Sequence, residues 1–454
     1  MKIKEPKNPN YVGQVVEIKA IVPLANRDRV VHAIIMGNKV ITDVSTKIGD
    51  VGIYFPVETA LSKEYLSVNN LYSHSENNAD KTKKGYFEKT GRVRCQKFGG
   101  HPSEGLFMPL DSLSGLGIDI KDLNMGDIFD ELNNVPICAK YVIKKTQSQG
   151  LGNNTNSRNP KVSKLIENQF KFHLDTAQLF RNTHKVLPNS LISITYKVHG
   201  TSSIASNLLC KKPLKWYEKF LKKIGVDVNV THYDSIWASR KVVKNENLYN
   251  DANSFYKEDI WGIANKELSE YLQEGMTFYF EIVGYLPSGG AIQSCKLGAF
   301  DYGCEPDKHE NYIYRIKYTN VKGKDFEFSA KQVQDFCKEN GLNAVPEMYY
   351  GYAKDFYDEY VLNTNPEFDG NGKLLSEVNL EKWQEGFLNA VKEKYNEKDC
   401  YMCKTAKLPE EGAVIRIEGI NCEVYKCKSR RFLEMETLDL DSGKIDIESD
   451  ESEN

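Results

Sequence analysis

The chain has 454 residues, of which 40 % are hydrophobic and 27 % are charged, and its formal net charge is −3. This composition predicts a globular protein of two or three domains. It excludes a strongly basic nucleic-acid-binding chain, although local basic patches can still bind an anion. No apolar run approaches the roughly 18 residues that span a bilayer, and the N-terminal segment lacks the apolar stretch of a secretory signal. Ten cysteines without a small-domain framework indicate reduced thiols. We therefore expect a protein of the cytoplasm or another reducing intracellular compartment, with no membrane partner and no indication of an oligomer.

The first part of the chain carries short strand-like runs separated by turn signals. The runs VGQVVEIKAIV, VVHAIIMGNKVITDV and GDVGIYFPV come first, and Gly37-Asn38 between alternating residues fits a hairpin. GRVRCQK and GLFMPL follow after a polar stretch. Five or so short strands predict a small β-barrel of the OB type over residues 1–135. Because OB barrels often bind nucleic acid on a basic face, we expect RNA contacts from three residues of this region: Arg92, Arg94 and Lys97.

The rest of the chain divides into three segments of different composition. The polar, glycine- and asparagine-rich segment KKTQSQGLGNNTNSRNPK has little to bury and predicts a linker over residues 136–164. Residues 165–445 mix strand-like runs such as LISITYK and MTFYFEIVG with helical patterns such as SAKQVQDFCKENG and LEKWQEGFLNAVKEKY. They predict an α+β domain. The acidic residues 446–454 predict a disordered tail.

An ordered series of short motifs begins with KVHG, which spans Lys197 to Gly200. KxxG alone is a weak signal, because a chain this rich in lysine and glycine contains about three by chance. Downstream, however, the chain contains in order SRK, FEIVG, YIYRI, EGAVIR and YKCKS. Each piece alone is compatible with an ordinary strand, so the order of the whole series is the informative feature.

This series resembles the motifs of the covalent nucleotidyltransferases, the superfamily of polynucleotide ligases and mRNA capping enzymes. The likeness is closest to the RNA ligases, because the first motif contains His199 where DNA ligases usually have aspartate. YKCKSRRFLE also looks like an RNA-ligase motif. In the N-terminal part, ANRDRV, GDVGIYFPVETAL and GRVRCQKFGGHPSEGLFMPL resemble the OB module of the fifth family of RNA ligases. The resemblance covers most of the chain but not the linker, the segment 211–232, a stretch near 365–405 or the tail.

The resemblance implies an α+β architecture in which an N-terminal OB-type β-barrel precedes an ATP-grasp-like nucleotidyltransferase domain of antiparallel sheets and helices. It also implies an ATP-dependent RNA ligase that seals nicks with 3′-OH and 5′-phosphate ends. Lys197 would attack the α-phosphate of ATP, the AMP would pass to an RNA 5′-phosphate, and a 3′-OH would displace it. The implied cofactors are ATP and Mg²⁺ or Mn²⁺, and the implied partner is nicked duplex RNA or an RNA/DNA hybrid.

The reaction needs an amine with a free lone pair. A free lysine has a pKa near 10.4 and is protonated at neutral pH, so we expect neighbouring cations and desolvation to favour the neutral form at the site. Lys426 and Lys428 alternate along one strand and therefore point to the same face. Two such cations repel each other unless an anion lies between them, and a nucleotide α-phosphate would fit there.

The resemblance assigns the other motif residues to the nucleotide and its metal. Glu411 would hold the water shell of the metal, which needs only one or two carboxylates, and Tyr314 would stack on adenine. The remaining residues assigned to ATP or AMP binding are Tyr196, His199, Gly200, Arg240, Glu281 and Arg416. Among them, Arg240 and Glu281 would contact the sugar and its phosphate, and Arg416 would contact phosphate.

Two departures from the pattern concern the base. Tyr196 stands where related RNA ligases often have glutamate near the adenine amino group, and Arg315 stands where an aspartate usually follows the stacking aromatic. A GTP-dependent mRNA guanylyltransferase is therefore one alternative. Capping enzymes and DNA ligases place an OB domain after the last motif, and only 26 residues follow Lys428, which argues against both. An inactive RNA-binding relic is a further alternative, and the intact set of motif lysines and glutamates argues against it.

Two further features have competing interpretations. Four cysteines, at positions 400, 403, 422 and 427, invite a zinc hypothesis. The last of them lies inside a motif, and its pair is spaced more widely than a zinc ribbon favours. KKPLKWYEKFLKK places Trp216 and Phe220 one helical turn apart among lysines. This pattern predicts an amphipathic surface helix, which could also follow a phosphate backbone.

Overall fold

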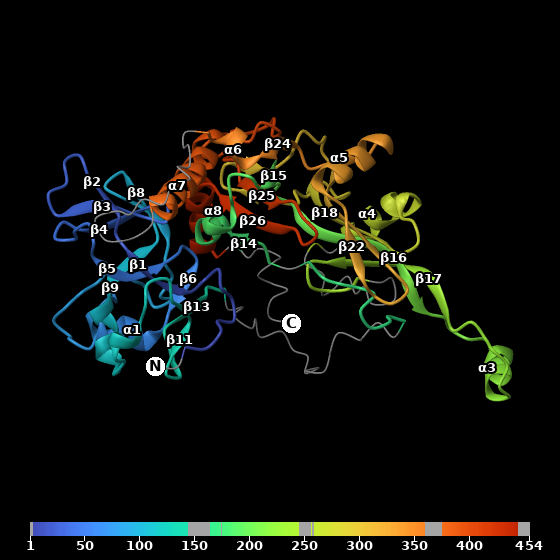
Figure 1. The fold of residues 1–454 in the computed structure, drawn as a ribbon, viewed down its shortest axis with the longest axis horizontal. Coiled ribbons are helices and arrows are strands. Elements are labelled where there is room, and N and C mark those ends of the chain that lie inside the picture. Colours follow the sequence, from blue (N-terminus) through green and yellow to red (C-terminus); the bar gives the residue numbers. More distant parts are fainter. Residues whose placement is uncertain are drawn as a thin grey trace.

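The structure is a computed structural model of the chain. It describes residues 3–143, 164–173, 175–244, 256, 258–358 and 375–443. These residues form an N-terminal region of short strands and a larger α+β region built on two mainly antiparallel sheets (Figure 1). None of the helices in these ranges is long and apolar enough to cross a bilayer. Most of the predicted linker and all of the predicted acidic tail lie outside the described residues.

The N-terminal region consists of thirteen short strands, one α-helix and three short 3₁₀-helices. The strands are β1 (Gly13–Glu17), β2 (Ala20–Pro23), β3 (Val30–Ile35), β4 (Asn38–Asp43), β5 (Val51–Phe55), β6 (Thr59–Leu61), β7 (Cys95–Phe98), β8 (His101–Glu104), β9 (Leu106–Pro109), β10 (Ile128–Phe129), β11 (Glu131–Leu132), β12 (Val135–Pro136) and β13 (Cys138–Lys140). The helices are α1 (Lys63–Val68), η1 (Ser75–Asn77), η2 (Leu110–Leu116) and η3 (Ile120–Asp122).

The N-terminal strands pair into small separate sheets. The largest has the order β10-β1-β5-β9, and β2-β3-β4 forms a second. The expected hairpin is confirmed between β3 and β4, where Met36 and Gly37 adopt the left-handed conformations that a two-residue turn requires. The hydrogen-bonded ladders of the described strands do not close on themselves, so the OB-type barrel is not confirmed. Strand β13 pairs with β6, so the folded N-terminal part includes residues assigned to the linker, and the domain boundaries stay predictions.

A five-stranded sheet forms one half of the larger region. Its order is β14-β26-β25-β15-β24, with all neighbours antiparallel except β14 and β26. Its elements are β14 (Ala177–Gln178), α2 (Leu179–Asn182), η4 (Thr183–Lys185), β15 (Leu191–Tyr196), β24 (Glu347–Tyr352), α6 (Ala353–Phe356), α7 (Leu375–Tyr395), β25 (Gly412–Ile417), β26 (Glu423–Lys428) and α8 (Arg430–Asp441). Trp383 and Phe387 of α7 are fully buried in one core cluster with Ile192 and Ile415 of the sheet.

A six-stranded sheet forms the other half. Its path is β17-β16-β18-β21-β22, and the short β23 pairs with β21. Its elements are β16 (Thr201–Lys211), α3 (Trp216–Lys223), β17 (Thr231–Ser239), α4 (Ile260–Leu268), η7 (Ser269–Tyr271), β18 (Met276–Gly284), β19 (Ser294–Cys295), β20 (Gly298–Ala299), β21 (His309–Thr319), β22 (Asp325–Glu327), α5 (Ala330–Glu339) and β23 (Asn343–Ala344). Trp261 of α4 and Val333 of α5 pack with Phe278 and Phe280 of β18.

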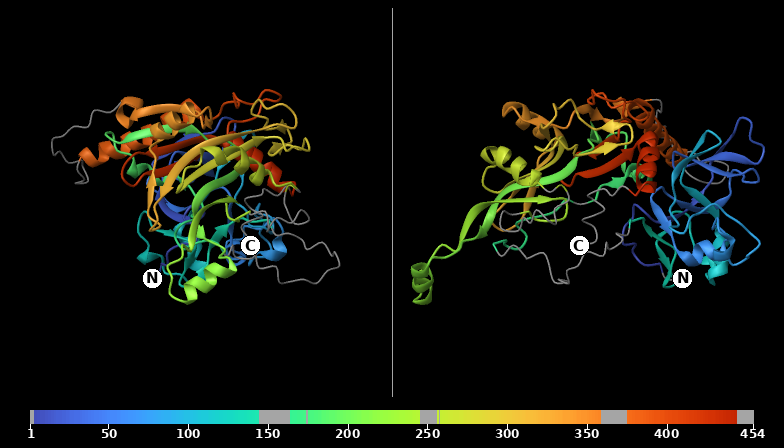
Figure 2. Two further views of the ribbon diagram at one scale, coloured as in Figure 1. Left: turned by 90° about the vertical axis from the view of Figure 1, so that its right-hand side faces the viewer. Right: turned by 180° about the vertical axis from the view of Figure 1, so that it is seen from behind.

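The N-terminal region and the tip of the β16–β17 hairpin lie at opposite ends of the molecule. Figure 2 shows both ends extending to the same side of the two central sheets. Helices α7 and α8 lie next to the N-terminal region (Figure 1), and Lys392 of α7 donates to the carbonyl oxygen of Gly37 at 2.6 Å. The two large sheets therefore form the centre of the structure, and their junction positions the candidate site.

Candidate active site

The KVHG segment connects the two large sheets. Strand β15 ends at Tyr196 in the five-stranded sheet, and β16 starts at Thr201 in the six-stranded sheet. The backbone N–H of Lys197 donates to the carbonyl oxygen of Gly412 at 2.9 Å. At Gly200 a Cβ atom would lie 2.3 Å from the carbonyl oxygen of Ile282. Glycine is therefore needed here because the backbone of β18 comes so close.

Glu411 lies at the centre of a cluster of cationic side chains. Its Oε1 is 2.7 Å from Nζ of Lys197 and 3.9 Å from Nζ of Lys428. Its Oε2 is 3.7 Å from Nδ1 of His199. The side chain is only 3 % exposed, and Oε2 is buried without a hydrogen-bond partner among the described residues. Such an oxygen is expensive to bury, so this atom is suited to a cation or a bound water.

Lys428 stays charged at this site. Burial alone would lower its pKa, but the carboxylates of Glu436 and Glu411 raise the pKa well above the ordinary lysine value. Nζ of Lys428 lies 2.9 Å and 3.0 Å from the two carboxylate oxygens of Glu436 on α8. The positive charge that the sequence predicts is present, and Glu436 offsets part of it.

Lys426 lines the same cavity as Lys428, as expected for alternate residues of β26. The buried Cys427 lies between them in sequence and belongs to the core on the other side of the sheet. The charge of Lys426 affects the carboxyl group of Asp175. Burial raises the pKa of Asp175, but the charges of Arg240 and then Lys426 lower it more, so the pKa lies below the ordinary value.

Arg240 forms an ion pair with Asp175, a residue to which the sequence analysis assigns no role. Arg416 is also engaged. Its guanidinium lies 3.0 Å from Glu327 and 3.2 Å from Glu418, and it donates to the carbonyl oxygen of Phe328 at 2.6 Å. These contacts fix Arg416 in the wall of the cavity, and its expected contact with phosphate stays a prediction.

Tyr314 and Glu281 line the cavity from the six-stranded sheet. The hydroxyl groups of Tyr314 and Ser202 are 3.4 Å apart, and Ser202 stands opposite Glu281 in the strand register. Burial and then the charge of Glu281 raise the pKa of the Tyr314 hydroxyl far above its ordinary value, so this side chain stays neutral. The ring of His173 meets Tyr314 edge-on at 5.5 Å.

Two aromatic neighbours fix His199. Its ring contacts two other rings edge-on: Phe300, the residue after β20, at a centroid distance of 4.8 Å, and Phe432 of α8 at 4.9 Å. Its backbone N–H donates to the hydroxyl of Tyr302 at 2.6 Å. The ring of Tyr196 lies 4.8 Å from that of Tyr401. Of these side chains, Tyr196, His199 and Phe432 line the cavity beside the lysine.

Glu327 is a second residue that the sequence analysis missed. It accepts from Arg315 at 2.6 Å and from Arg416 at 3.0 Å. Burial opposes its ionisation, but Arg315 lowers the pKa of Glu327 below the ordinary value. A carboxylate therefore stands next to Arg315, the position where the sequence pattern lacks one. Glu327 is on the short β22 outside every motif, so only the fold reveals it.

The three residues predicted to bind RNA contact other protein segments. Arg92 is buried and lies 2.7 Å from Glu58 and 3.2 Å from Asp441 of α8. Nε of Arg94 lies 3.4 Å from Asp441, and Lys97 forms an ion pair of 3.2 Å with another α8 carboxylate. Burial and then the charge of another glutamate raise the pKa of Glu58 to about 7. Arg92 joins the N-terminal region to α8 through these two ion pairs. Because the Arg92 side chain is only 2 % exposed, it offers no surface to RNA in this arrangement.

The cavity at the junction has a volume of about 690 Å³, within the range of ordinary ligand sites. Both large sheets, α8 and the N-terminal residues Tyr11, Glu58 and Tyr141 line it. The zinc hypothesis gains no support, because the described part of the chain contains no group of three or more His, Cys, Asp or Glu side chains that could hold a metal. A magnesium-type site needs fewer protein ligands.

No protein-family model matches the chain, and no curated protein matches its sequence. Its fold is similar to solved structures of the RNA ligase of Naegleria gruberi. A mutant of that ligase with ATP and Mn has a TM-score of 0.55 at 14 % identity, covering 93 % of this chain and 98 % of the other. A second mutant, with AMP and Mn, has a TM-score of 0.53 at 14 % identity and covers the same shares of the two chains. A third mutant, with ATP and Mn, has a TM-score of 0.53 at 13 % identity, covering 95 % of this chain and 100 % of the other. The chain therefore has the α+β fold of an RNA-ligase nucleotidyltransferase.

Proposed function

We propose that the protein is an ATP-dependent RNA ligase that seals 3′-OH/5′-phosphate nicks through a lysyl-AMP intermediate on Lys197. The observation that carries the proposal is the cluster of Lys197, Glu411 and Lys428 at the wall of the cavity between the two sheets. The likeness to RNA-ligase structures supports it. The substrates would be ATP and nicked duplex RNA or an RNA/DNA hybrid, with Mg²⁺ or Mn²⁺ as the metal.

In the first step, Nζ of Lys197 attacks the α-phosphorus of ATP. A nitrogen–phosphorus bond forms and the bond to the pyrophosphate oxygen breaks, so pyrophosphate leaves with the electron pair. The ion pair with Glu411 has to open first, because Nζ is 2.7 Å from that carboxylate, and the ammonium proton would leave to solvent, to which the Lys197 side chain is 27 % exposed. Lys428 remains charged and Lys426 lines the same wall, so these two cations would face the negative charge of the transferring phosphate.

The donor set fits a divalent cation. Glu411 has one buried oxygen without a hydrogen-bond partner in the described part of the chain, and Mg²⁺ prefers carboxylate oxygens and keeps several of its waters. Glu411 would hold the cation through this oxygen or through water. A bound cation there would offset the charge of the phosphates. A cation at Oε2 would weaken the hold of Oε1 on Lys197, because it offsets the negative charge that the two oxygens share.

The base would lie against Tyr314. This ring is neutral and forms part of the cavity wall, and an aromatic face suits a purine. The site departs from the family pattern at Tyr196 and Arg315, and Glu327 supplies a carboxylate beside Arg315. We propose ATP as the nucleotide, and the labelling experiment below compares it directly with GTP.

The test is to incubate the protein with α-labelled ATP or GTP and Mg²⁺ and to detect labelled protein. Transfer from ATP alone, lost in Lys197→Ala and kept in Lys331→Ala, supports the ligase; Lys331 is an exposed lysine of α5 paired only with Asp335. Label from GTP would instead support a capping guanylyltransferase, and no label would support an inactive relic. Nicks with ribose or deoxyribose on each side then define the substrate. We expect a requirement for ribose on the 3′-OH side, and equal sealing of all-DNA nicks would contradict it.

A further inference from the structure

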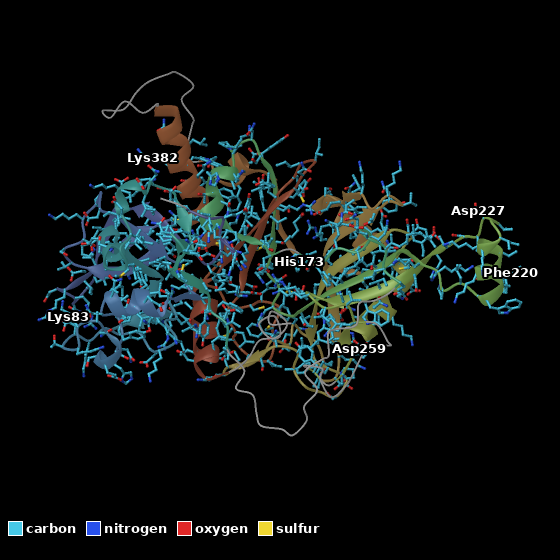
Figure 3. All side chains as sticks on the ribbon, turned by 90° about the horizontal axis from the view of Figure 1, so that it is seen from below. Lys83, His173, Phe220, Asp227, Asp259 and Lys382 are labelled. Carbon is cyan, nitrogen blue, oxygen red and sulfur yellow. The ribbon has the colours of Figure 1, made fainter. Side chains whose placement is uncertain are left out.

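The β16–β17 hairpin continues beyond the sheet as a projecting arm. The last paired residues are Lys211 and Thr231, and we define the arm as residues 212–230. It contains α3, which stands clear of the rest of the described structure in Figure 1 and in the right-hand view of Figure 2. In Figure 3, Phe220 and Asp227 mark its far end, opposite Lys83 of the N-terminal region. The arm belongs to the segment that the family resemblance does not cover.

The arm leaves a stripe of large apolar side chains in water. Trp216 is 81 % exposed, and Phe220 and Ile224 are each 58 % exposed. Their spacing of four residues places them on one side of the helix. The aromatic contact of Trp216 is with its own neighbour Tyr217, and the high exposure of the stripe shows that no other described segment covers it. Exposed apolar surface of this kind commonly marks an interaction site.

The arm is also basic on a chain that is acidic as a whole. It contains five lysines against two acidic residues, a net charge of +3, whereas the whole chain has −3. Lys212 is paired with Glu218 at 2.6 Å. The other four form no ion pair with any described residue: Lys215, Lys219, Lys222 and Lys223. The arm therefore combines an apolar stripe with lysines beside it. Such a surface is complementary to an elongated polyanion that has apolar groups between its negative charges.

The position of the arm indicates which polyanion. Strand β16 begins directly after the loop of Lys197 and has 11 residues, so it extends about 36 Å from the reactive lysine. A B-form duplex advances about 3.4 Å per base pair, so this length is about ten base pairs of B-form duplex and somewhat more of an A-form RNA duplex, whose base pairs are more closely spaced along the axis. The arm and the N-terminal region extend to the same side of the central sheets (Figure 2), and a duplex bound at the cavity would pass the arm.

We propose that the arm binds the duplex RNA substrate about one helical turn from the ligation point. The wide, shallow minor groove of an RNA duplex presents riboses. The stripe of Trp216, Phe220 and Ile224 would lie against these riboses while the flanking lysines contact phosphates. The inference rests on the proposed function, because it takes RNA as the substrate of the cavity.

The hairpin allows a clean deletion. Because Lys211 and Thr231 are directly paired, residues 212–230 can be replaced by Asn-Gly, which forms a two-residue hairpin turn. A second variant changes Lys215, Lys219, Lys222 and Lys223 to alanine, and a matched control changes the same four to arginine. Each protein is assayed for lysine adenylylation with ATP alone and for the Kd of a nicked RNA duplex at several salt concentrations.

We expect adenylylation within about twofold of wild type in all variants, because β16 and the lysine loop are unchanged. The deletion and the alanine variant should bind the duplex about tenfold more weakly at low salt, and the arginine control should bind normally. Each lost lysine–phosphate contact removes roughly 0.9 from the slope of log Kd against log salt, so four lost contacts lower the slope by about 3.6. The wild type should also bind duplexes that extend about 16 base pairs beyond the nick more tightly than duplexes that extend about 6 base pairs. The deletion variant should bind both lengths equally.

Two results would overturn the inference, and a third would overturn the proposed function alone. If adenylylation and sealing are intact but the deletion does not change the Kd, the arm does not bind RNA and the proposed function still stands. If the wild type is not adenylylated, the proposed function fails, and the Kd comparison still decides whether the arm binds RNA. If the arm is required for binding to vesicles of phosphatidylserine but not for binding to RNA, its partner is an anionic membrane and the inference is wrong.

Discussion

The buried Glu410 should make the free energy of unfolding depend on pH, and the size of this dependence follows from the pKa of its carboxyl group. The side chain is 3 % exposed, and burial, followed by the neighbouring Cys400, raises the pKa of Glu410 from 4.5 to about 9. The folded protein therefore keeps a proton at pH 7 that the unfolded chain releases. Unfolding releases this proton above pH 4.5, so stability falls as the pH rises from about 4.5 to about 9. At 1.36 kcal/mol per pH unit, the loss between pH 4.5 and pH 7 is about 3 kcal/mol.

Glu410→Gln keeps the shape of the neutral acid and removes the titration. The variant should match the wild type near pH 4.5, and its free energy of unfolding should be greater by about 3 kcal/mol at pH 7. Urea denaturation at pH 5, 7 and 8.5 measures the difference, and Glu339→Gln on the exposed end of α5 is the matched control. Adenylylation should be retained. A difference between variant and wild type that is the same at pH 5 and pH 8.5 would show that Glu410 is ionised in the fold and refute the reasoning.

Three further substitutions test the site and its attachment. Glu411→Gln should lower adenylylation about 100-fold in the labelling assay, because it removes the charge that would hold the metal. Arg92→Met should lower the free energy of unfolding by about 3 kcal/mol in urea, because it leaves a buried carboxylate without its partner; an unchanged midpoint would show that this ion pair is not structural. Gly200→Ala should lower adenylylation at least tenfold, because its Cβ would lie 2.3 Å from a β18 carbonyl oxygen, whereas Gly290→Ala, with its nearest atom at 3.5 Å, should be normal.

The sequence predicted the elements whose pattern is local. The hairpin of β3 and β4, the helices α5 and α7 and the exposed amphipathic α3 all appear where the alternation or the helical spacing indicates. The motif residues are also brought to one cavity, because each motif lies on or beside a strand that reaches the junction of the sheets. Whether the N-terminal strands close into a barrel depends on long-range pairing, which the local pattern does not contain.

The partners of the site residues were not predictable, because they come from elements without a motif. Asp175 pairs with Arg240 across 65 residues, and Glu327 pairs with Arg416 across 89 residues. The burial of Arg92 is of the same kind. Its basic strand looks like a nucleic-acid contact, but the carboxylates of Glu58 and α8 take up its charge. A charge pattern shows which residues can bind an anion, and only the fold shows which anion is already there.

The cluster at Lys197 also changes how its activation has to be explained. From the sequence, two motif lysines were expected to crowd the reactive amine with positive charge. In the structure, Nζ of Lys197 lies 2.7 Å from a carboxylate oxygen of Glu411, and Glu436 offsets the charge of Lys428. An amine that donates to a carboxylate oxygen points at that oxygen and is not aimed at a phosphorus atom. If Glu411 binds the metal through Oε2, the bound cation offsets the negative charge that Oε1 presents to Lys197 and adds positive charge beside the lysine. One residue would then couple the binding of the cofactors to the release of the nucleophile, so the ligand-free site would hold its lysine inactive until both are present.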